Sequence, residues 1–391
     1  MRIELGALLA VALLAGSSSV AGTSIQQEED SPRPQPVHGE ECPADCATCG
    51  AAVERALDYL AAQQQEDGSF PAKRASLRYV RSDRHVVQVM TAALAGLAFL
   101  AEGSSATSGR YSGAIQGVER YLRLRVEEIL AADPVLAGGG GGPIYSTALS
   151  LLFFTHLYER TRNSENAGSV KALVRYLSGR VGSEVGKSAW QRGKDTGAVW
   201  YVSGVTALLN LTVIALVRAA AAGFRVEDGF LDLARSYYRD IAERNGSFKY
   251  DIDGMFPTEP RQGRSVAALL ALKGLGCLLQ EEYASALAYA RKNVDRTMAH
   301  HTPSLHMTLG AFAFHALGAE DWEKFAVAHM AKLVFRQQED GRLETIWDED
   351  RGLMMQPNDL EWGPNYATAN FALIVQIPRG YVRLYSSRRE Y

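Results

Sequence analysis

One short phrase returns six times along the 391-residue chain and constrains its fold more than any other feature. Each copy has Thr or Ala as its second residue and opens a run of small and apolar residues. These second residues lie at positions 91, 147, 206, 267, 308 and 368, which are 41 to 61 residues apart. A period of this size predicts one supersecondary unit stacked on copies of itself. The copies are Met90–Leu94, Ser146–Leu149, Val205–Leu208, Val266–Leu269, Met307–Leu309 and Ala367–Ala369.

A second, more polar helix is predicted ahead of each phrase, marked by an aromatic residue close to a Leu. Residues 55–60, 118–122 and 172–177 show the pattern. Charged and apolar residues interleave at helical spacing there, which is typical of a helix with one wet face. The helices that the phrases open are apolar nearly all round, so they must be buried on both sides. Later copies of the marker are Tyr237, Tyr238, Tyr289, Phe325 and Phe335.

These helix pairs predict an all-α fold, an α/α toroid of six helical hairpins. The apolar helices would form an inner ring and the amphipathic helices an outer ring around it. Closing the ring also removes the exposed ends that an open solenoid would have to cap. We expect the toroid to occupy residues 51–391 as one domain.

The residues ahead of the toroid form three predicted segments. Residues 1–21 carry Arg2, an apolar run and small residues ending in Ala21, which is the layout of a secretory signal peptide. Residues 22–41 are rich in Gln, Glu, Ser and Pro and are expected to be a disordered linker. Residues 42–50 form a Cys-rich segment. The chain is therefore predicted to be secreted or periplasmic.

Composition excludes two classes of partner. The net charge is -3, and Lys and Arg are scattered evenly, which argues against nucleic-acid binding. After the first 21 residues no apolar run reaches the length of a membrane span, so none is expected once the signal is removed.

A second pattern lies at the ends of the outer helices. Residues 64–70 and 337–343 follow the form Q-x-x-x-G-x-aromatic, with Leu in place of the aromatic in the second copy, and residues 245–248 are a shortened copy. This pattern resembles the QW-type repeat of the squalene cyclase and protein prenyltransferase superfamily. The resemblance covers about residues 50 to 380. It implies the toroid fold, with a Gln that caps helix ends and a Gly that allows a tight turn.

The catalytic motifs of that superfamily are missing. The cyclases carry an acidic D-x-D-D cluster before an inner helix, but no acidic residue directly precedes the repeated phrase in this chain. The prenyltransferases use a zinc site with Asp two residues before Cys, whereas Leu275 stands two residues before Cys277. The resemblance therefore implies a binding or scaffold protein for a small-molecule, glycan or protein ligand. The alternative is an enzyme that acts on a polysaccharide or isoprenoid substrate in the toroid cavity.

Candidate functional residues lie in the long loops before the inner helices, which gather at one mouth of a toroid. Glycan-acting toroids use paired carboxylates across such a mouth. Four acidic residues could form that pair: Asp251, Asp253, Asp359 and Glu361. The candidate ligand-binding residues are His85, Trp190, Trp200, His301, His306, Trp362 and Tyr366.

The Cys-rich segment allows two interpretations. His38, Cys42, Cys46 and Cys49 give the spacing H-x3-C-x3-C-x2-C. One His and three Cys can hold a structural zinc ion, and in an exported protein a disulfide within the trio is the other expectation. No other cofactor is predicted.

Overall fold

The computed structural model describes residues 46–73, 85–131, 142–182, 206–227, 229–250, 262–300, 302–346 and 358–385. These residues belong to one compact unit, Pro36–Tyr391. They are helical, and they contain no β-strand beyond one isolated bridge between Ala242 and Phe248. None of their helices is long and apolar enough to cross a membrane. The predicted all-α fold is confirmed.

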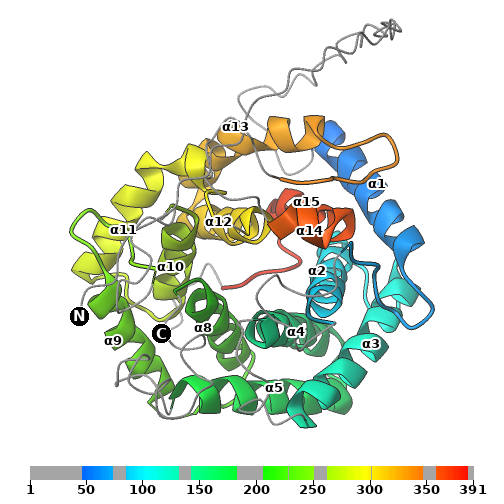
Figure 1. Ribbon diagram of the computed structural model, residues 1–391, viewed down its shortest axis with the longest axis horizontal. Helices are drawn as coiled ribbons and strands as arrows, with labels where there is room; N and C mark the ends of the chain where they lie inside the picture. Colours follow the sequence, from blue (N-terminus) through cyan, green and yellow to red (C-terminus); the bar gives the residue numbers. More distant parts are fainter. Residues whose placement is uncertain are drawn as a thin grey trace, which may run out of the picture. The chain divides into compact units, whose positions relative to one another are not determined.

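The apolar helices form a closed inner ring (Figure 1). Each packs against the next in the order α2, α4, α8, α10, α12 and α15, and α15 packs against α2 again. Almost every residue of these helices is buried, as expected for helices covered on both sides. Their bounds are α2 Val86–Glu102, α4 Gly142–Thr161, α8 Thr206–Ala221, α10 Gln262–Gly274, α12 Pro303–Leu317 and α15 Pro364–Gln376.

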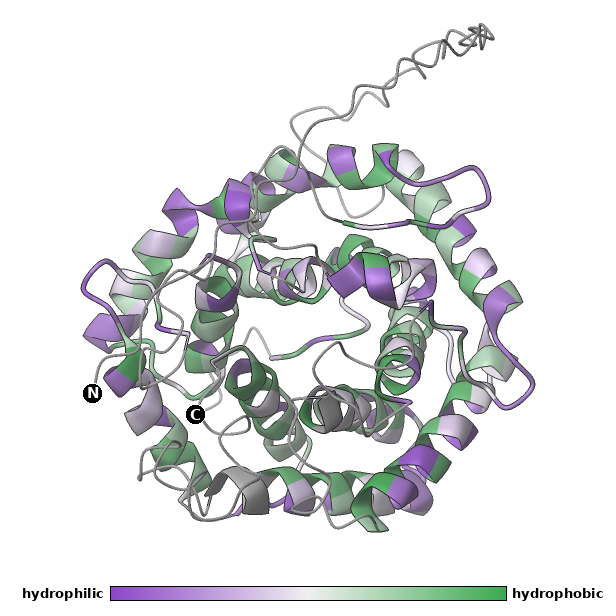
Figure 2. Cartoon of the chain, viewed as in Figure 1, coloured by the Kyte–Doolittle hydropathy of each residue, from purple (hydrophilic) through white to green (hydrophobic). Residues whose placement is uncertain are grey.

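The more polar helices surround this ring. Figure 2 shows hydrophilic residues concentrated on the outer helices, while the inner helices are mainly hydrophobic. Each outer helix buries one face only; in α9, for example, Phe230, Tyr237 and Ile241 are among the buried residues. The outer helices are α1 Ala47–Gln63, α3 Ser112–Ala131, α5 Ser164–Gly182, α9 Phe230–Ile241, α11 Glu281–Lys292 and α13 Ala319–Phe335. Short helices lie between the larger ones: α14 Asn358–Trp362, η1 Val294–Arg296 and η3 Ile377–Arg379.

The glutamine turns join neighbouring outer helices. The Gln64 amide donates to the carbonyl of Gly68 within its own turn and to that of Ala114 on α3. The Gln337 amide does the same with Gly341 and with Ala52 on α1, which closes the outer ring. The predicted tight turns at Gly68 and Gly341 are confirmed, but each Gln amide joins its turn to a carbonyl within the next outer helix and does not cap a helix end.

The turn glycines also set how closely the outer helices approach. Gly68, Gly246 and Gly341 have φ between +84° and +91°. A Cβ atom on any of them would lie about 2 Å from a backbone carbonyl oxygen of the next outer helix: that of Gly117 (1.9 Å), Ser285 (2.1 Å) or Arg55 (2.2 Å), respectively. Both the backbone conformation and the contact therefore require glycine.

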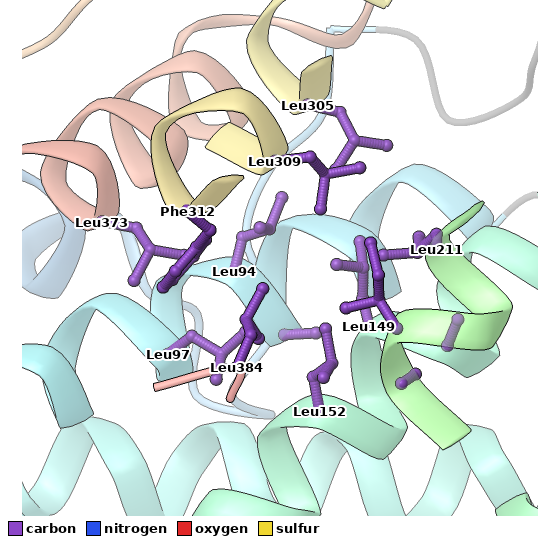
Figure 3. Packing of buried hydrophobic residues seen from close by; sticks show 14 of the residues in the cluster. Leu94, Leu97, Leu149, Leu152, Leu211, Leu305, Leu309, Phe312, Leu373 and Leu384 are labelled. Carbon is purple, nitrogen blue, oxygen red and sulfur yellow. The ribbon is translucent and has the colours of Figure 1, made fainter. Parts of the chain in front are cut away.

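The interior of the inner ring is filled by its own side chains (Figure 3). The side chains that point inward are mostly leucines, and between 0% and 6% of each is exposed. A water-sized probe thus reaches almost none of their surface, so the space between them is packed. These residues are Leu94, Leu97, Leu149, Leu152, Leu211, Leu305, Leu309, Phe312, Leu373 and Leu384.

The two ends of the ring differ. Hydrogen bonds gather the beginnings of the inner helices at one end: Asn365 of α15 donates to the Pro71 carbonyl ahead of α2, and the Gly263 amide of α10 donates to the Ala299 carbonyl ahead of α12. The helix ends meet at the opposite side, where Arg160 of α4 donates to the Leu100 carbonyl of α2. We refer to these as the N-terminal end and the C-terminal end of the ring.

Replacing Gly341 with Ala should lower the free energy of unfolding by about 2 kcal/mol or more, because the left-handed backbone and the Arg55 carbonyl both oppose a Cβ atom. Gly168 is the matched control. It lies within α5, and no atom lies within 4 Å of the position that a Cβ atom would take there, so Gly168→Ala should stabilise the chain by up to about 1 kcal/mol. Urea unfolding followed by circular dichroism measures both. Equal effects of the two substitutions would contradict this account of the turn.

Candidate functional site

Asp359 forms the centre of the candidate site, at the N-terminal end of the ring. It lies on the short helix α14, just before α15, and its side chain is fully buried. Its Oδ2 atom accepts a hydrogen bond from the backbone N–H of Ser304 at 3.0 Å and a second from the Ser304 hydroxyl. Its Oδ1 atom is buried and has no hydrogen-bond partner among the described residues. One oxygen is therefore anchored and the other is left unsatisfied.

The environment of Asp359 favours its protonated form. Burial raises the pKa of this carboxyl to about 7, although the two hydrogen bonds from Ser304 oppose the shift. Ser304 is in the first turn of α12, where backbone N–H groups lack partners within the helix. Asp359 thus satisfies one of these donors and also attaches α14 to α12.

Aromatic and amide side chains of the same segment lie beside Asp359. The rings of Trp362 and Tyr366 pack edge to face, with centroids 4.6 Å apart. Both are buried, so the Trp362 ring supports Tyr366 and has no exposed face in this structure. Burial raises the pKa of Tyr366 well above its usual value, and the nearby charge of Asp359 adds to the effect. Tyr366 therefore keeps its proton. The side-chain oxygen of Asn365 is another buried acceptor without a partner among the described residues.

Two histidines pack together just before and within the start of α12. The rings of His300 and His306 have centroids 3.8 Å apart, and the Thr302 hydroxyl contacts Nδ1 of both. The Thr302 amide can only donate, so Nδ1 of His300 must accept from it. The Thr302 carbonyl can only accept, so Nδ1 of His306 must donate. In their neutral forms His300 therefore carries its proton on Nε2, and His306 carries its lone pair there.

A buried arginine lies at this end of the ring. Arg264 lies in the first turn of α10 and is 1% exposed. Its Nε–H donates to the Phe248 carbonyl at 3.1 Å, and its guanidinium carbon lies 5.4 Å from the centre of the Tyr250 ring. The Tyr250 carbonyl in turn accepts from the Thr206 amide at the start of α8. The α8–α10 side of this end thus combines a fixed positive charge with an aromatic ring.

The structure brings together part of the predicted site. Asp359, Trp362 and Tyr366 form one buried cluster, and His306 lies on α12 close in sequence to Ser304. Glu361 lies on α14 with them. His85 is an exposed residue at the start of α2, where Nδ1 contacts Gln88 Oε1 at 2.9 Å. The other candidates lie outside the described residues: Asp251, Asp253, Trp190, Trp200 and His301.

Sequence reasoning did not identify Ser304 or Arg264 as site residues. Ser304 follows Pro303 at the first position of an inner helix, and this placement is a usable signal because such N–H groups need an external acceptor. Arg264 stands three residues before Ala267 of the repeated phrase, in a helix that is otherwise apolar. A charged residue at a position predicted to be buried is a second signal that could have been used.

The described residues contain no group of three or more His, Cys, Asp or Glu side chains placed to hold a metal ion. Of the predicted zinc or disulfide residues, Cys46 directly precedes α1 and Cys49 lies in its first turn. His38 and Cys42 lie outside the described residues, so that prediction stays a prediction.

A cavity of about 350 Å³ opens elsewhere, on the outer ring between the turn after α9 and the start of α11. Glu243, Arg244, Glu281 and Glu282 are among its lining residues. It is separate from the Asp359 cluster.

Comparison with known proteins places the fold among α/α toroids. No family model matches the sequence, and a comparison with curated proteins finds no match. Solved structures do match in fold. An inactive variant of an α-1,6-mannanase of glycoside hydrolase family 76 from Salegentibacter sp., in complex with α-1,6-mannotriose, has a TM-score of 0.56 at 10% identity, covering 85% of this chain and 99% of that one.

Two further toroids are similar. A protein from Salmonella enterica, described as a possible member of glycoside hydrolase family 105, has a TM-score of 0.51 at 12% identity, covering 92% of this chain and all of that one. An unsaturated glucuronyl hydrolase specific for heparin has a TM-score of 0.52 at 11% identity, covering 84% and 96%. These likenesses support the toroid, but they do not support the squalene cyclase and prenyltransferase superfamily by name.

The mannanase variant was inactivated by replacing two consecutive aspartates with asparagine. No two aspartates are consecutive in the present chain. This chain therefore lacks that pair in the same form.

The pKa of Asp359 predicts how stability depends on pH. Its folded-state pKa of about 7 exceeds the ordinary value of 3.8, so between these values the folded chain binds more protons than the unfolded chain. The contribution of this group to the free energy of unfolding is complete below about pH 4 and is lost as pH rises to about 7. Asp359→Asn removes this dependence and should stabilise the chain by about 1–3 kcal/mol at pH 8, with little effect near pH 4.

Thermal unfolding at a series of pH values measures this difference. Glu320→Gln, an exposed carboxylate on α13, is the control and should leave the shape of the profile unchanged above about pH 5, because Lys324 lowers the pKa of Glu320 and keeps it ionised there. If Asp359→Asn instead lowered stability at pH 8, Asp359 would be an ionised helix cap and not a protonated acid.

Proposed function

We propose that this chain is a glycan-acting enzyme, a glycoside hydrolase-like toroid whose general acid is Asp359. A buried carboxyl with a pKa of about 7 carries the proposal. Glycosidic oxygens leave only when they are protonated, and a carboxylic acid that keeps its proton near neutral pH can supply that proton.

The arrangement of the two carboxyl oxygens suits this role. Ser304 fixes Oδ2 through its amide and its hydroxyl, which orients the carboxyl group. Oδ1 makes no hydrogen bond to the described residues and is therefore available to carry the proton toward a substrate oxygen. Because Asp359 is fully buried, a substrate must displace whatever covers it before the transfer.

The packed interior supports a substrate at the N-terminal end of the ring and not inside it. An isoprenoid handler would need a wide apolar cavity, whereas the inward leucines are almost completely buried. A glycan needs polar partners, and these are found at the N-terminal end: Asp359, Asn365, Tyr366 and Arg264. This location favours the polysaccharide alternative over the isoprenoid one.

The similar structures support the same proposal. One holds a mannotriose, and others are described as mannosidases or as a glucuronyl hydrolase. At 10% to 12% identity these likenesses concern the fold, so the proposal rests on the carboxyl itself. A glycosidase ordinarily uses a second carboxylate. Glu361, two residues along α14, is the described candidate, and Asp251 and Asp253 are the others.

The test is hydrolysis of a glycan panel by the purified chain. Suitable substrates are an α-1,6-linked mannan, unsaturated heparin disaccharides and a neutral β-glucan, with released reducing ends as the readout. We expect turnover of one class, and we expect Asp359→Asn to lower kcat/KM about 100- to 10,000-fold because the proton donor is lost.

Three controls make the result specific. Asp359→Asn must retain cooperative unfolding, Glu320→Gln must retain full activity, and Glu361→Gln reports whether the second carboxylate lies on α14. Full activity in Asp359→Asn, or the absence of both hydrolysis and glycan binding across the panel, would contradict the proposed function.

A further inference from the structure

The C-terminal end of the ring is closed by the chain's own last described residues. Beyond η3 the backbone turns at Gly380, which has φ +72°, and residues 381–385 then cross the ends of the inner helices. Burial alternates along this segment: Val382 and Leu384 are 3% and 4% exposed, while Tyr381 and Arg383 face outward. Leu384 lies among Leu97 and Leu152 in the ring interior (Figure 3).

The ring holds this segment through its backbone. Arg160 of α4 donates to the Tyr381 carbonyl at 3.1 Å. Arg218 of α8 donates through Nε to the Arg383 carbonyl at 2.8 Å, and His156 contacts the same oxygen at 2.9 Å through Nε2. The polar contacts thus reach backbone carbonyl oxygens, while Val382 and Leu384 contribute buried apolar side chains. The exposed Tyr381 ring adds a contact of another kind, with its centre 5.8 Å from the guanidinium carbon of Arg160. The carbonyl and apolar contacts require only an oxygen acceptor and an apolar group.

The surroundings carry positive charge. Arg160, Arg218 and Lys273 all lie in the last turns of inner helices, and Arg383 lies beside them. Two acidic residues lie at this end: Glu159 pairs with Arg218, and Glu102 at the end of α2 lies near Arg160. Lys273 is half-buried and has no ion pair among the described residues. Burial lowers the pKa of Lys273.

The hydrogen bonds of His156 depend on how many protons its ring carries. Nδ1 lies 2.8 Å from the Leu152 carbonyl and Nε2 lies 2.9 Å from the Arg383 carbonyl, and both oxygens can only accept. A neutral imidazole has one N–H, so it can donate to only one of them. Burial and the charge of Arg218 lower the pKa of His156 to about 4, so at neutral pH one of these contacts is made without a proton. A negatively charged acceptor in place of the Arg383 carbonyl would favour the doubly protonated ring.

We propose that the C-terminal end of the ring is a binding site for an anionic amphiphile with a single apolar chain, and that residues 380–385 occupy this site as a built-in plug. The apolar chain takes the place of Val382 and Leu384 among the ring leucines. The acidic group takes the place of the Arg383 carbonyl and accepts from Arg218 and His156. Charge-assisted hydrogen bonds from Arg to a carboxylate are stronger than those to a neutral carbonyl. The acidic group of the ligand would therefore bind Arg218 more strongly than the Arg383 carbonyl does. The site lies at the opposite end from Asp359 and does not depend on the proposed glycan chemistry.

Two truncated chains test the proposal. One ends at Arg379 and lacks the plug, and its matched control ends at Tyr385 and keeps it. Calorimetric titration with dodecanoate below its micelle concentration should show one binding site per chain, at least tenfold tighter in the chain ending at Arg379. Dodecanol has the same chain without the charge and should bind at least fivefold more weakly than dodecanoate. Arg218→Gln in the shortened chain should remove that preference.

Three results would contradict the proposed amphiphile site. If the shortened chain unfolds cooperatively, has an unchanged helical circular dichroism spectrum and binds dodecanoate no more tightly than its control, the proposal fails. If the shortened chain does not fold, the double variant V382A/L384A of the full chain decides, and no gain in dodecanoate binding there overturns it. Binding to phosphatidylglycerol vesicles without binding to dodecanoate would also contradict a site for a single amphiphile.

Discussion

Burial of the inner helices on two sides is the constraint on which the rest of the structure depends. A helix that is apolar all round cannot lie at a surface, so the six described inner helices pack against each other and beneath an outer layer. Six such helices in a closed ring leave a central space that their own leucines fill. With the interior occupied by apolar side chains, the polar residues of the two proposed sites lie at the two ends of the ring. At the N-terminal end the first N–H groups of the helices need acceptors from outside the helix, and at the C-terminal end the last carbonyls need donors such as the cations found there.

This difference between the ends accounts for both proposed sites. At the N-terminal end, Asp359 meets the amide of Ser304, and the same burial that covers the helix start keeps the carboxyl protonated. At the C-terminal end, Arg160 and Arg218 donate to the Tyr381 and Arg383 carbonyls, and the chain returns to cover the opening. A buried acid and an apolar plug are thus two consequences of one packing arrangement. The acid is the feature on which the proposed glycan chemistry depends.

Periodicity was sufficient to predict the fold because each repeated phrase carries the whole pattern of one inner helix. The turn after α13 was predictable too, since Gln337 and Gly341 repeat the spacing of Gln64 and Gly68. The pairs that build the sites were not predictable. Ser304 and Asp359 are 55 residues apart, and His156 and Arg383 are 227 apart. Their contact depends on how closely neighbouring hairpins pack, which no local pattern records.

The sequence indicated Asp359, Trp362 and Tyr366 as members of one polar loop, but it could not show that all three are buried. Burial determines their chemistry. It raises the pKa of the Asp359 carboxyl to about 7. It also leaves Trp362 as packing support for Tyr366 and not as an exposed stacking surface. The resemblance to the cyclase repeat described the turns correctly, and the similar structures connect the fold with glycosidases instead.

The measurement that tests this account most directly is the titration of Asp359 itself. Carbon-13 NMR of protein labelled at the aspartate carboxyls, compared with the spectrum of Asp359→Asn, assigns the one resonance that disappears. We expect that resonance to titrate with a midpoint near pH 7, the value that burial gives this carboxyl. A midpoint below about pH 5 would show that Asp359 is ionised at neutral pH, and it would contradict its role as the acid.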